Sequence, residues 1–465
     1  MHWPHQAIQR IYSDIDLNPL RQKTARLGAA GEPISLFDRG NAMTSLDSTR
    51  RKIRGVAVAA IITLASLIAP ASASVAAADN AVVSWDINAQ TAIFDVAAQP
   101  QTAQVRSFAM VSGAVYDAVN AIAGTPYRPY LLAPPATGAE STDAAVATAA
   151  FRVLVALFPE QLERLQGQYD QSLAAIPDSP SKQDGIAVGD QAAAAMIAAR
   201  QNDGVFGNQT WMVGSRPGEW RPTPPTFDSQ GAWLGHLTPF LIPDASMFRT
   251  AGPPGLTTRE YARDVNEVKQ VGSKSSTVRT ADQTEAARWW HDRRSTGWEV
   301  KRQLATTQRL NTLQTARMFA MADLSVADAA IACYDEKAAW NFWRPITAIQ
   351  LADADGNPRT KPDPAWTPLL VTPPFPEYTS GHACATGARM STFAVFFGKN
   401  SIPFSATSAD TGTTRSFAGF SQAITEAVDA RVWGGIHFRT ADTEGAKIGI
   451  QVTAFMARHY FRPQR

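Results

Sequence analysis

The chain has 465 residues, a formal net charge of +2, and a composition of 45% hydrophobic and 18% charged residues. Its length suggests two or three domains, and its apolar content excludes a disordered protein. The 30 Gly and 30 Pro residues are close to average usage, which excludes collagen-like and proline-rich classes. The small net charge argues against nucleic-acid binding. Two Cys cannot form a disulfide framework or a Cys-rich zinc site.

Near the start of the chain, residues 49–78 have the features of an export signal. A basic stretch is followed by an uncharged apolar run and then by small residues suited to cleavage. The apolar run is shorter than the ~20 residues of a membrane-spanning helix, so a membrane anchor is the less favoured interpretation. Because Met43 would put the signal at the usual position, residues 1–42 are interpreted as an over-assigned start. We expect residues 1–78 to be removed, leaving a periplasmic or extracellular protein without a stable membrane span.

The mature chain, residues 79–465, holds 34 basic and 36 acidic residues and is therefore slightly acidic. It is predicted to be mostly helical, because small and apolar residues recur at helical spacing while sustained alternation of apolar and polar residues is scarce. The first helices are predicted over Ser107–Ile122, Ala144–Ile176 and Gly185–Arg200.

Residues 216–256 differ from the helical segments around them. Eight Pro residues in this stretch prevent long helices, and five large aromatic residues lie among them. Such aromatic density favours a lid or wall packed beside a site, with a domain linker as the alternative. Helical patterning returns at about Thr258 and continues to the end of the chain.

Three later segments carry chemistry, and the first is residues 335–345. Lys337 and Arg344 are seven positions apart, so both cations are predicted to leave one face of a single helix. This helix is expected to begin near Ser325 and to bend or end at Pro345. Two cations at this spacing are usually a solvated stripe, but three large apolar neighbours argue against that here: Trp340, Phe342 and Trp343.

The second segment is residues 375–383, in which Ser380, Gly381 and His382 follow several Pro residues and are predicted to open a helix. Free backbone N–H groups and the helix dipole attract an anion at such a position. Ser380 adds a hydroxyl donor, Gly381 allows close approach, and His382 can exchange protons near neutral pH. A Ser N-cap followed by an incidental His is the alternative.

The third segment is residues 430–439. A helix from about Ser421 should end at the Gly434-Gly435 pair, which places Arg431 on its last turn and His437 in the following turn. Another helix over 441–460 is expected to pack behind. Alone, His437 would more often be a structural residue. Together, however, the segments offer three cations and a helix N-terminus, which can share a buried pocket only if an anion such as a tetrahedral or five-coordinate oxyanion neutralises them.

The combined pattern resembles the vanadium-dependent haloperoxidases and the related type-2 phosphatidic-acid-phosphatase (acid phosphatase) superfamily. The shared pattern is Lys, six residues, Arg-Pro; then Pro-Ser-Gly-His; then Arg, five residues, His. All three parts occur here in the expected order, with Thr379 where Pro is often found. The likeness extends over roughly residues 80–465, including segments 116–122 and 272–290. It implies an all-α fold of helical bundles, in one domain or two fused halves, with the catalytic segments within 325–445.

The resemblance also implies vanadate as the cofactor. His437 would ligate vanadium, and the oxyanion would be held by Lys337, Arg344, Ser380, Gly381 and Arg431. His382 would be the acid–base residue, and Lys337 would assist catalysis by drawing electron density from peroxide. The partners would be hydrogen peroxide, halide and small organic acceptors, with no nucleic acid. Phe375 and Tyr334 are the candidates for the halide pocket.

One position departs from the pattern. The superfamily usually has Asp four positions after the last His, but this chain has Ala441 there and Asp442 next. The carboxylate that orients the histidine would then be displaced or supplied elsewhere, and Asp442 becomes a candidate cap of the last helix. Three functions stay open: a secreted haloperoxidase, which the aromatic Pro-rich segment favours; a secreted acid phosphatase with His437 as nucleophile; and a non-catalytic oxyanion-binding protein.

The two Cys and two further His have weaker indications. Cys333 and Cys384 lie near the first and second segments. They could form one disulfide after export, although small buried residues are the favoured interpretation. His236 and His291 are candidates for the entrance of the site, but each is more typical of a surface or structural residue.

Overall fold

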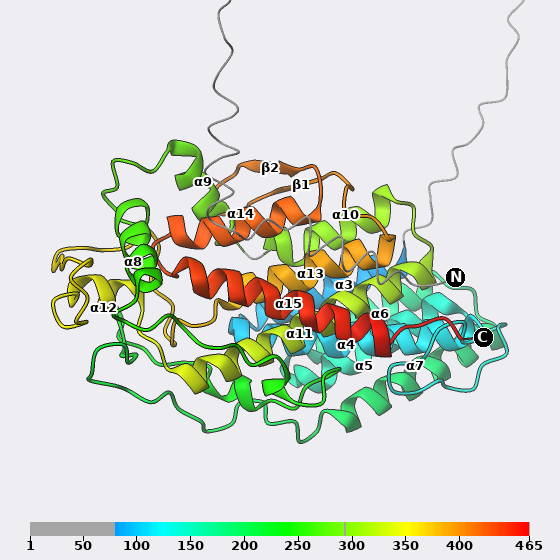
Figure 1. The fold of residues 1–465 in the computed structure, drawn as a ribbon. Helices are drawn as coiled ribbons and strands as arrows, with labels where there is room; N and C mark the ends of the chain where they lie inside the picture. Colours follow the sequence, from blue (N-terminus) through cyan, green and yellow to red (C-terminus); the bar gives the residue numbers. More distant parts are fainter. Residues whose placement is uncertain (1–79, 293, 465) are drawn as a thin grey trace, which may run out of the picture. The chain divides into compact units, whose positions relative to one another are not determined.

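The computed structural model describes residues 80–292 and 294–464, which all lie in one compact unit (Figure 1). The predicted export signal lies outside these residues. The fold is all-α, as predicted, and the described residues contain one short antiparallel hairpin. No helix in the described ranges is long and apolar enough to cross a membrane.

Helices of the amino-terminal half pack against one another around α4. Their bounds are α3 Ala81–Gln90, a π-helical turn Thr91–Val96, α4 Gln101–Ile122, α5 Thr142–Leu157, α6 Leu162–Ala174 and α7 Pro180–Ala199. Helix α4 contacts α5, α7 and α11. Nearly all of its residues are buried, because small and apolar side chains occur on every side of the helix.

Two predictions for this half need correction. The single helix predicted over 144–176 is two helices, separated at Phe158 and Pro159. Pro159 disfavours helical backbone at the preceding residue, and Phe158 has φ −138° and ψ 66°. Helix α7 begins at Pro180, earlier than predicted, because the side chain of Ser179 accepts the backbone N–H of Lys182 and Pro suits the first helical position.

The Pro-rich segment is packed and contains only short 3₁₀ turns, at Ala232–His236 and Ala245–Phe248. Its aromatic residues Trp220 and Trp233 are buried. The carboxylate of Asp328 in α11 accepts three consecutive backbone N–H groups of the segment, those of residues 240–242, at 2.6–2.7 Å. The segment is therefore fastened to the main helix of the fold.

The carboxy-terminal half is built around α11, which contacts α4 on one side and α13 and α15 on the other (Figure 1). Its helices are α8 Arg259–Val271, α9 Ala281–Trp289, a π-helical turn Ser295–Glu299, α10 Val300–Thr307, α11 Thr312–Trp340, α12 Pro345–Gln350, α13 Gly381–Phe397, α14 Phe420–Trp433 and α15 Arg439–His459. The predicted starts and ends of α13 and α14 agree with these bounds.

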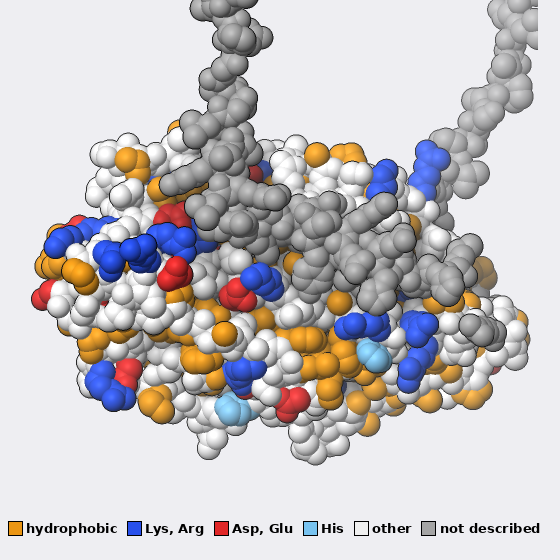
Figure 2. Space-filling model, in the orientation of Figure 1, with side chains coloured by type: hydrophobic (Ala, Val, Ile, Leu, Met, Phe, Trp, Pro, Cys, Tyr) orange, Lys and Arg blue, Asp and Glu red, His pale blue; other side chains and the backbone are white. Residues whose placement is uncertain are grey.

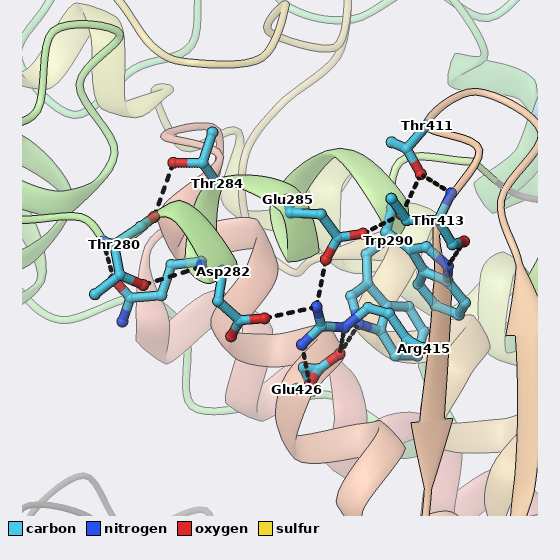
Figure 3. A network of polar contacts seen from close by, with 11 residues as sticks. Thr280, Asp282, Thr284, Glu285, Trp290, Thr411, Thr413, Arg415 and Glu426 are labelled. Atoms are coloured by element: carbon cyan, nitrogen blue, oxygen red, sulfur yellow. Dashed lines mark hydrogen bonds and ion pairs between the residues drawn. The ribbon is translucent and has the colours of Figure 1, made fainter.

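A hairpin of β1 (Phe404–Thr407) and β2 (Thr414–Phe417) pairs antiparallel, with Phe404 opposite Phe417. Arg415 of β2 forms ion pairs with Glu426 of α14 at 2.6 Å and with Asp282 and Glu285 of α9 (Figure 3). This network fastens the hairpin to α14, the helix that carries Arg431.

One face of the molecule shows where the surface charges gather. Figure 2 shows Lys and Arg side chains over α8, interspersed with acidic ones, and apolar side chains towards the middle of the face. The three cations of the predicted site, Lys337, Arg344 and Arg431, are all buried. They are therefore separate from this surface group.

Candidate active site

Residues of the second and third predicted segments line one cavity of about 480 Å³, whereas Lys337, Arg344 and Ser380 are not among its lining residues. Six predicted site residues line it: Tyr334, Phe375, Gly381, His382, Arg431 and His437. Gln230 and Leu234 of the Pro-rich segment line it too, so this segment is a wall of the cavity. His291 is also among the lining residues, whereas His236 is not.

Lys337 and Arg344 do not share a helix, contrary to the prediction. Helix α11 ends at Trp340, and Asn341 then adopts the left-handed conformation with φ 43° and ψ 43°. Arg344 is extended, with φ −78° and ψ 156°, because Pro345 begins α12 and disfavours helical backbone at the residue before it. The chain therefore reverses between the two cations, and each approaches the site from its own element.

The ammonium group of Lys337 organises the loop that precedes α13. Its Nζ donates to the carbonyl oxygens of Pro376 at 2.8 Å, Glu377 at 3.0 Å and Thr379 at 2.5 Å. A charged ammonium has three N–H donors, and all three have acceptors here. Burial, and after it the charge of Arg344, lowers the pKa of Lys337 well below its usual value, but three carbonyl acceptors suit the charged form.

Arg344 connects the loop of Phe375 with the turn before α15. Its Nε donates to the Phe375 carbonyl at 2.8 Å, and its Nη1 lies 2.8 Å from the Ile436 carbonyl and 3.2 Å from Nε2 of His437. Its Nη2 is buried and has no hydrogen-bond partner within the described residues. Burial lowers the pKa of Arg344 to about 10, so the side chain remains a cation at neutral pH.

The start of α13 has the geometry predicted for it. Ser380 is the N-cap, and its side chain accepts the backbone N–H of Ala383 at 3.5 Å. The backbone N–H of Ser380 donates to the Ala441 carbonyl at 3.1 Å, which joins this turn to α15. Gly381 and His382 face the cavity. The helix dipole therefore favours an anion beside Gly381.

Helix α14 ends as predicted and places the other two site residues. Gly435 has φ +77°, and a Cβ atom there would lie 2.3 Å from the carbonyl oxygen of Gly272. Only glycine fits both the left-handed backbone and this close approach. Arg431 consequently lies on the last turn of α14, and His437 lies in the turn that follows.

The orienting carboxylate for His437 is supplied by Glu377. The Nδ1 atom of His437 lies 2.9 Å from Oε1 of Glu377, which also accepts the backbone N–H of Phe438 at 2.9 Å. An Nδ1–H donor to this carboxylate leaves Nε2 with its lone pair, which is consistent with the N–H of Arg344 facing it. Burial lowers the pKa of His437 well below its usual value. The imidazole is therefore neutral, with a basic lone pair on Nε2.

Glu377 was not identified from the sequence. It lies 60 residues before His437, so neither helical spacing nor a local motif connects the two. The available signal was a single acidic residue between Pro376 and Tyr378, in a segment already assigned to an anion site. Burial raises the pKa of Glu377 to about 8, while Arg344 opposes this shift.

Asp442 does not cap the last helix, contrary to the prediction. The N-cap position of α15 belongs to Phe438, and Asp442 lies on the first turn with a fully buried side chain. The Ser380 side chain lies beside its carboxyl group. Burial raises the pKa of Asp442 well above its usual value, although Ser380 and Arg431 act in the opposite direction.

Phe375 and Tyr334 form an aromatic wall of the cavity, with ring centroids 5.2 Å apart. Nζ of Lys337 and Cζ of Arg344 lie 5.1 Å and 5.0 Å from the centroid of Phe375. Cys333 and Cys384 are fully buried and are paired as a disulfide, with Cα atoms 6.6 Å apart. The disulfide interpretation, the less favoured one from the sequence, is therefore the one observed.

The charges of the site suit a small oxyanion such as vanadate or phosphate. Three buried cations, Lys337, Arg344 and Arg431, face two buried carboxyl groups, Glu377 and Asp442. Even with both carboxylates ionised, one positive charge is in excess, and each proton that they hold increases the excess. The unsatisfied Nη2 of Arg344 and the start of α13 add donors. The residues present therefore fit a tetrahedral oxyanion, with Nε2 of His437 as the nitrogen donor.

Residues 317–464, which contain every one of these segments, match the family model of the vanadium chloroperoxidase second helical-bundle domain. The resemblance to vanadium-dependent haloperoxidases expected from the sequence is thereby confirmed. Vanadium chloroperoxidase of Curvularia inaequalis is 30% identical over 174 residues, which cover 30% of this chain and 28% of that protein. The match spans little more than a quarter of the relative's length.

Two solved structures extend the likeness in fold beyond the family region. The first bacterial vanadium-dependent iodoperoxidase has a TM-score of 0.71 and 24% identity, and the match covers 83% of this chain and 97% of that one. A holo-type bacterial vanadium-dependent chloroperoxidase has a TM-score of 0.64 and 17% identity, with 77% and 91% covered. At these identities the likeness establishes a common fold.

Proposed function

We propose that the protein is a vanadate-dependent haloperoxidase, which uses hydrogen peroxide to oxidise halide to hypohalous acid. The observation that carries the proposal is the neutral His437, held by Glu377 within a buried cationic pocket. A metal-ligating histidine commonly donates its other ring N–H to a carboxylate, which fixes the tautomer and raises ligand basicity. The match of residues 317–464 to the vanadium chloroperoxidase second helical-bundle domain supports the same activity.

Each site residue then has a defined task. Nε2 of His437 would bind vanadium, while Arg344, Arg431, the Ser380 hydroxyl and the N–H of Gly381 would hold the oxyanion. Vanadate, when bound, supplies a Lewis-acid centre that activates hydrogen peroxide. Lys337 has its three donors on carbonyl oxygens. Its proposed contribution is therefore the field of a buried cation and the shape of the 376–379 loop.

His382 is the proposed proton carrier. Its side chain lines the cavity beside Gly381, at the position where protons must reach the oxyanion. Formation of hypohalous acid and water from halide and hydrogen peroxide consumes one proton, which a histidine can supply near neutral pH. Phe375 and Tyr334 offer the apolar wall for the halide and for a small organic acceptor.

A phosphatase is the second candidate, because the same geometry suits a histidine nucleophile. Nε2 of the neutral His437 could attack a phosphate ester, and His382 would protonate the leaving group. A non-catalytic oxyanion-binding protein was favoured only by the missing Asp at position 441. Glu377 contacts His437 as that carboxylate would, so the third candidate loses the observation that favoured it.

One experiment separates the two enzymatic candidates. Purified protein is assayed with and without vanadate for peroxide-dependent halogenation and for phosphoester hydrolysis. We expect vanadate to restore halogenation and phosphate to inhibit it, because both ions compete for the pocket. A halogenation rate that changes with neither vanadate nor phosphate, or that depends on iron, would contradict the proposal. Hydrolysis without halogenation would favour the phosphatase.

We also propose that the protein is exported and that residues 1–73, or 1–78, are removed. The basic, apolar and small-residue order of residues 49–78 supports this. N-terminal sequencing of exported material should begin after residue 73. A sequence that begins before Gly55 would reject the proposal.

A further inference from the structure

A side cavity of about 60 Å³ adjoins the main one. One face of α4 and one face of α13 form its walls, and residues of α11 and of the turn at 295–299 close it. The residues from α4 and α13 follow helical spacing: Gln101, Gln104, Val105 and Phe108, and His382, Ala385, Thr386 and Arg389. Gln101, Val105, His382 and Ala385 line both cavities, so the two meet at the proposed acid–base histidine.

The side cavity contains a cation that the proposed mechanism does not use. Arg389 lies two helical turns beyond His382 on the same face of α13. Its Nε atom is buried without a hydrogen-bond partner, and within the described ranges its guanidinium forms no ion pair. Burial lowers the pKa of Arg389 to about 10, so it is charged at neutral pH. A partly buried guanidinium without a counter-ion is costly unless the cavity admits one.

The carboxylate of Asp323 interacts electrostatically with Arg389 but already has other partners. Asp323, whose side chain also lines the side cavity, accepts from Nζ of Lys301 at 2.7 Å and from the Ser112 hydroxyl at 2.5 Å. Lys301 in turn pairs with Asp86 at 2.6 Å, and Asp86 pairs with Arg302 at 2.6 Å. Charges therefore alternate along this buried chain, and three cations meet two carboxylates. Arg389 forms one end of this chain and has no ion pair within the described residues, whereas Arg302 at the other end also interacts with Glu299.

We propose that the side cavity binds a small monovalent anion, which is a halide if the proposed function holds. The space is roughly that of a small ion with one or two waters. Phe108 and Trp298 supply aromatic surface, and the positive edges of aromatic rings can face an anion. A guanidinium is weakly hydrated, which suits a large, weakly hydrated halide.

The position of this site gives it a specific task. A halide bound beside Arg389 lies in a cavity that opens into the main cavity at His382, about 10 Å away along α13. It is therefore held in a space connected with the oxyanion site without occupying that site. Arg389 is then a specificity-determining residue for the halide. It does not contact the oxyanion, and vanadate affinity should not depend on it.

Bromide binding to the full, folded protein tests the site without vanadate and without peroxide. Bromide-soaked crystals should show an anomalous peak within contact distance of Arg389, and ⁸¹Br line broadening in solution should give an affinity. We expect Arg389→Met to weaken bromide binding at least about tenfold, as loss of a hydrogen bond to a charged group does, and Arg389→Lys to retain part of it. Arg164→Met is the matched control, since Arg164 has a buried Nε without a partner but lies on α6, outside both cavities.

The outcomes separate this site from the proposed function. In an active enzyme, Arg389→Met should raise the KM for halide about tenfold while leaving vanadate affinity unchanged. Bromide at Arg389 in a protein without halogenating activity would support the anion site while the proposed function fails. Equal bromide affinity of the wild type and a folded Arg389→Met, or a bromide peak in the main cavity alone, would overturn the site. If the variants do not fold, the presence or absence of a bromide peak beside Arg389 in wild-type crystals still tests the site.

Discussion

At the scale of single residues, the candidate site depends on buried charged groups whose partners define their roles. Glu377 faces the ring N–H of His437, while Lys337 faces three carbonyl oxygens. A buried charge without such partners is destabilising. The identity of each partner therefore shows which groups are held in place and which atoms, such as Nη2 of Arg344, remain for an anion.

The role of Glu377 leads to a first prediction. Glu377→Gln keeps the shape of the side chain but replaces the carboxyl group that holds the Nδ1–H of His437 with an amide, which cannot ionise. Vanadate affinity should fall roughly 10–100-fold, as is typical when such an outer carboxylate is lost. Isothermal titration with vanadate measures this. Glu336→Gln is the control, since Glu336 is equally buried but contacts Thr250 and Trp340 instead. Equal losses in both variants would refute the assignment.

Substitution of His437 and substitution of His382 should have different effects on vanadate binding and on activity. His437→Ala removes the neutral nitrogen donor, so affinity for vanadate should drop strongly. His382→Ala leaves the oxyanion contacts in place and removes proton transfer, typically worth 10²–10⁴-fold in rate. Vanadate should therefore still bind His382→Ala, while halogenation falls and its pH dependence changes. Titration of both folded variants with vanadate is decisive, and loss of the ion in His382→Ala alone would reverse the two roles.

At the scale of secondary-structure elements, the ends of helices position the chemistry. Helix α11 stops three residues after Lys337, α13 starts at Gly381, and α14 ends before His437. Helix ends have backbone groups without intrahelical partners, and they allow the chain to change direction. Three separate helices can therefore bring polar groups together at one site.

The end of α11 can be tested at Asn341. Asn341→Val places a β-branched residue at φ 43°, which should cost about 1–2 kcal/mol of stability. Asn341→Gly suits the same conformation and should be close to neutral. Chemical denaturation of both variants measures the difference. If valine and glycine were equally tolerated, the left-handed residue would not determine where this helix ends.

The attachment of the Pro-rich segment to α11 predicts a pH effect. Burial raises the pKa of Asp328 to about 6, above the ordinary value of about 4 in an unfolded chain. The folded state then binds the extra proton, so this group's contribution to stability falls as pH rises from about 4 to 6, by up to about 3 kcal/mol. Asp328→Asn should flatten that part of the stability curve. Unfolding free energies at several pH values test this, and parallel curves for the two proteins would contradict it.

At the scale of the whole molecule, α11 joins the amino-terminal helices to the catalytic segments. It contacts α4, α13 and α15, and its residue Cys333 is bonded to Cys384 of α13. The disulfide lies behind the site, where Thr379 donates to Sγ of Cys333 at 3.1 Å. Its position suggests that it maintains the packing of two helices and takes no part in the anion chemistry.

Removal of the disulfide should therefore affect stability more than function. The double variant Cys333→Ala with Cys384→Ala should lose about 2–4 kcal/mol of stability, because a long loop is no longer closed. The folded variant should retain vanadate binding and activity. Thermal unfolding and vanadate titration of the same sample give both quantities. Loss of activity in a well-folded double variant would show a catalytic role for the pair.

The sequence by itself determined the helical class, the start of α13, the end of α14 and the three segments of the site. These features depend on near neighbours, such as the Ser380 cap, the glycines after α14 and Pro345, whose effects act within a few residues. Local rules also misled where two of them competed. The seven-residue spacing of Lys337 and Arg344 suggested one helix, but Asn341 and Pro345 end one helix and begin another.

Only the tertiary structure decided which groups act together across the chain. The pairing of Glu377 with His437, the three carbonyls around Lys337 and the Cys333–Cys384 bond all join residues about 40 or more positions apart. In the sequence Arg389 is a single cation among small and apolar residues, and its place in a side cavity follows from the packing of α13 against α4 and α11. The physical reason is that burial and charge balance depend on every element around a group, whereas a motif records only its neighbours along the chain.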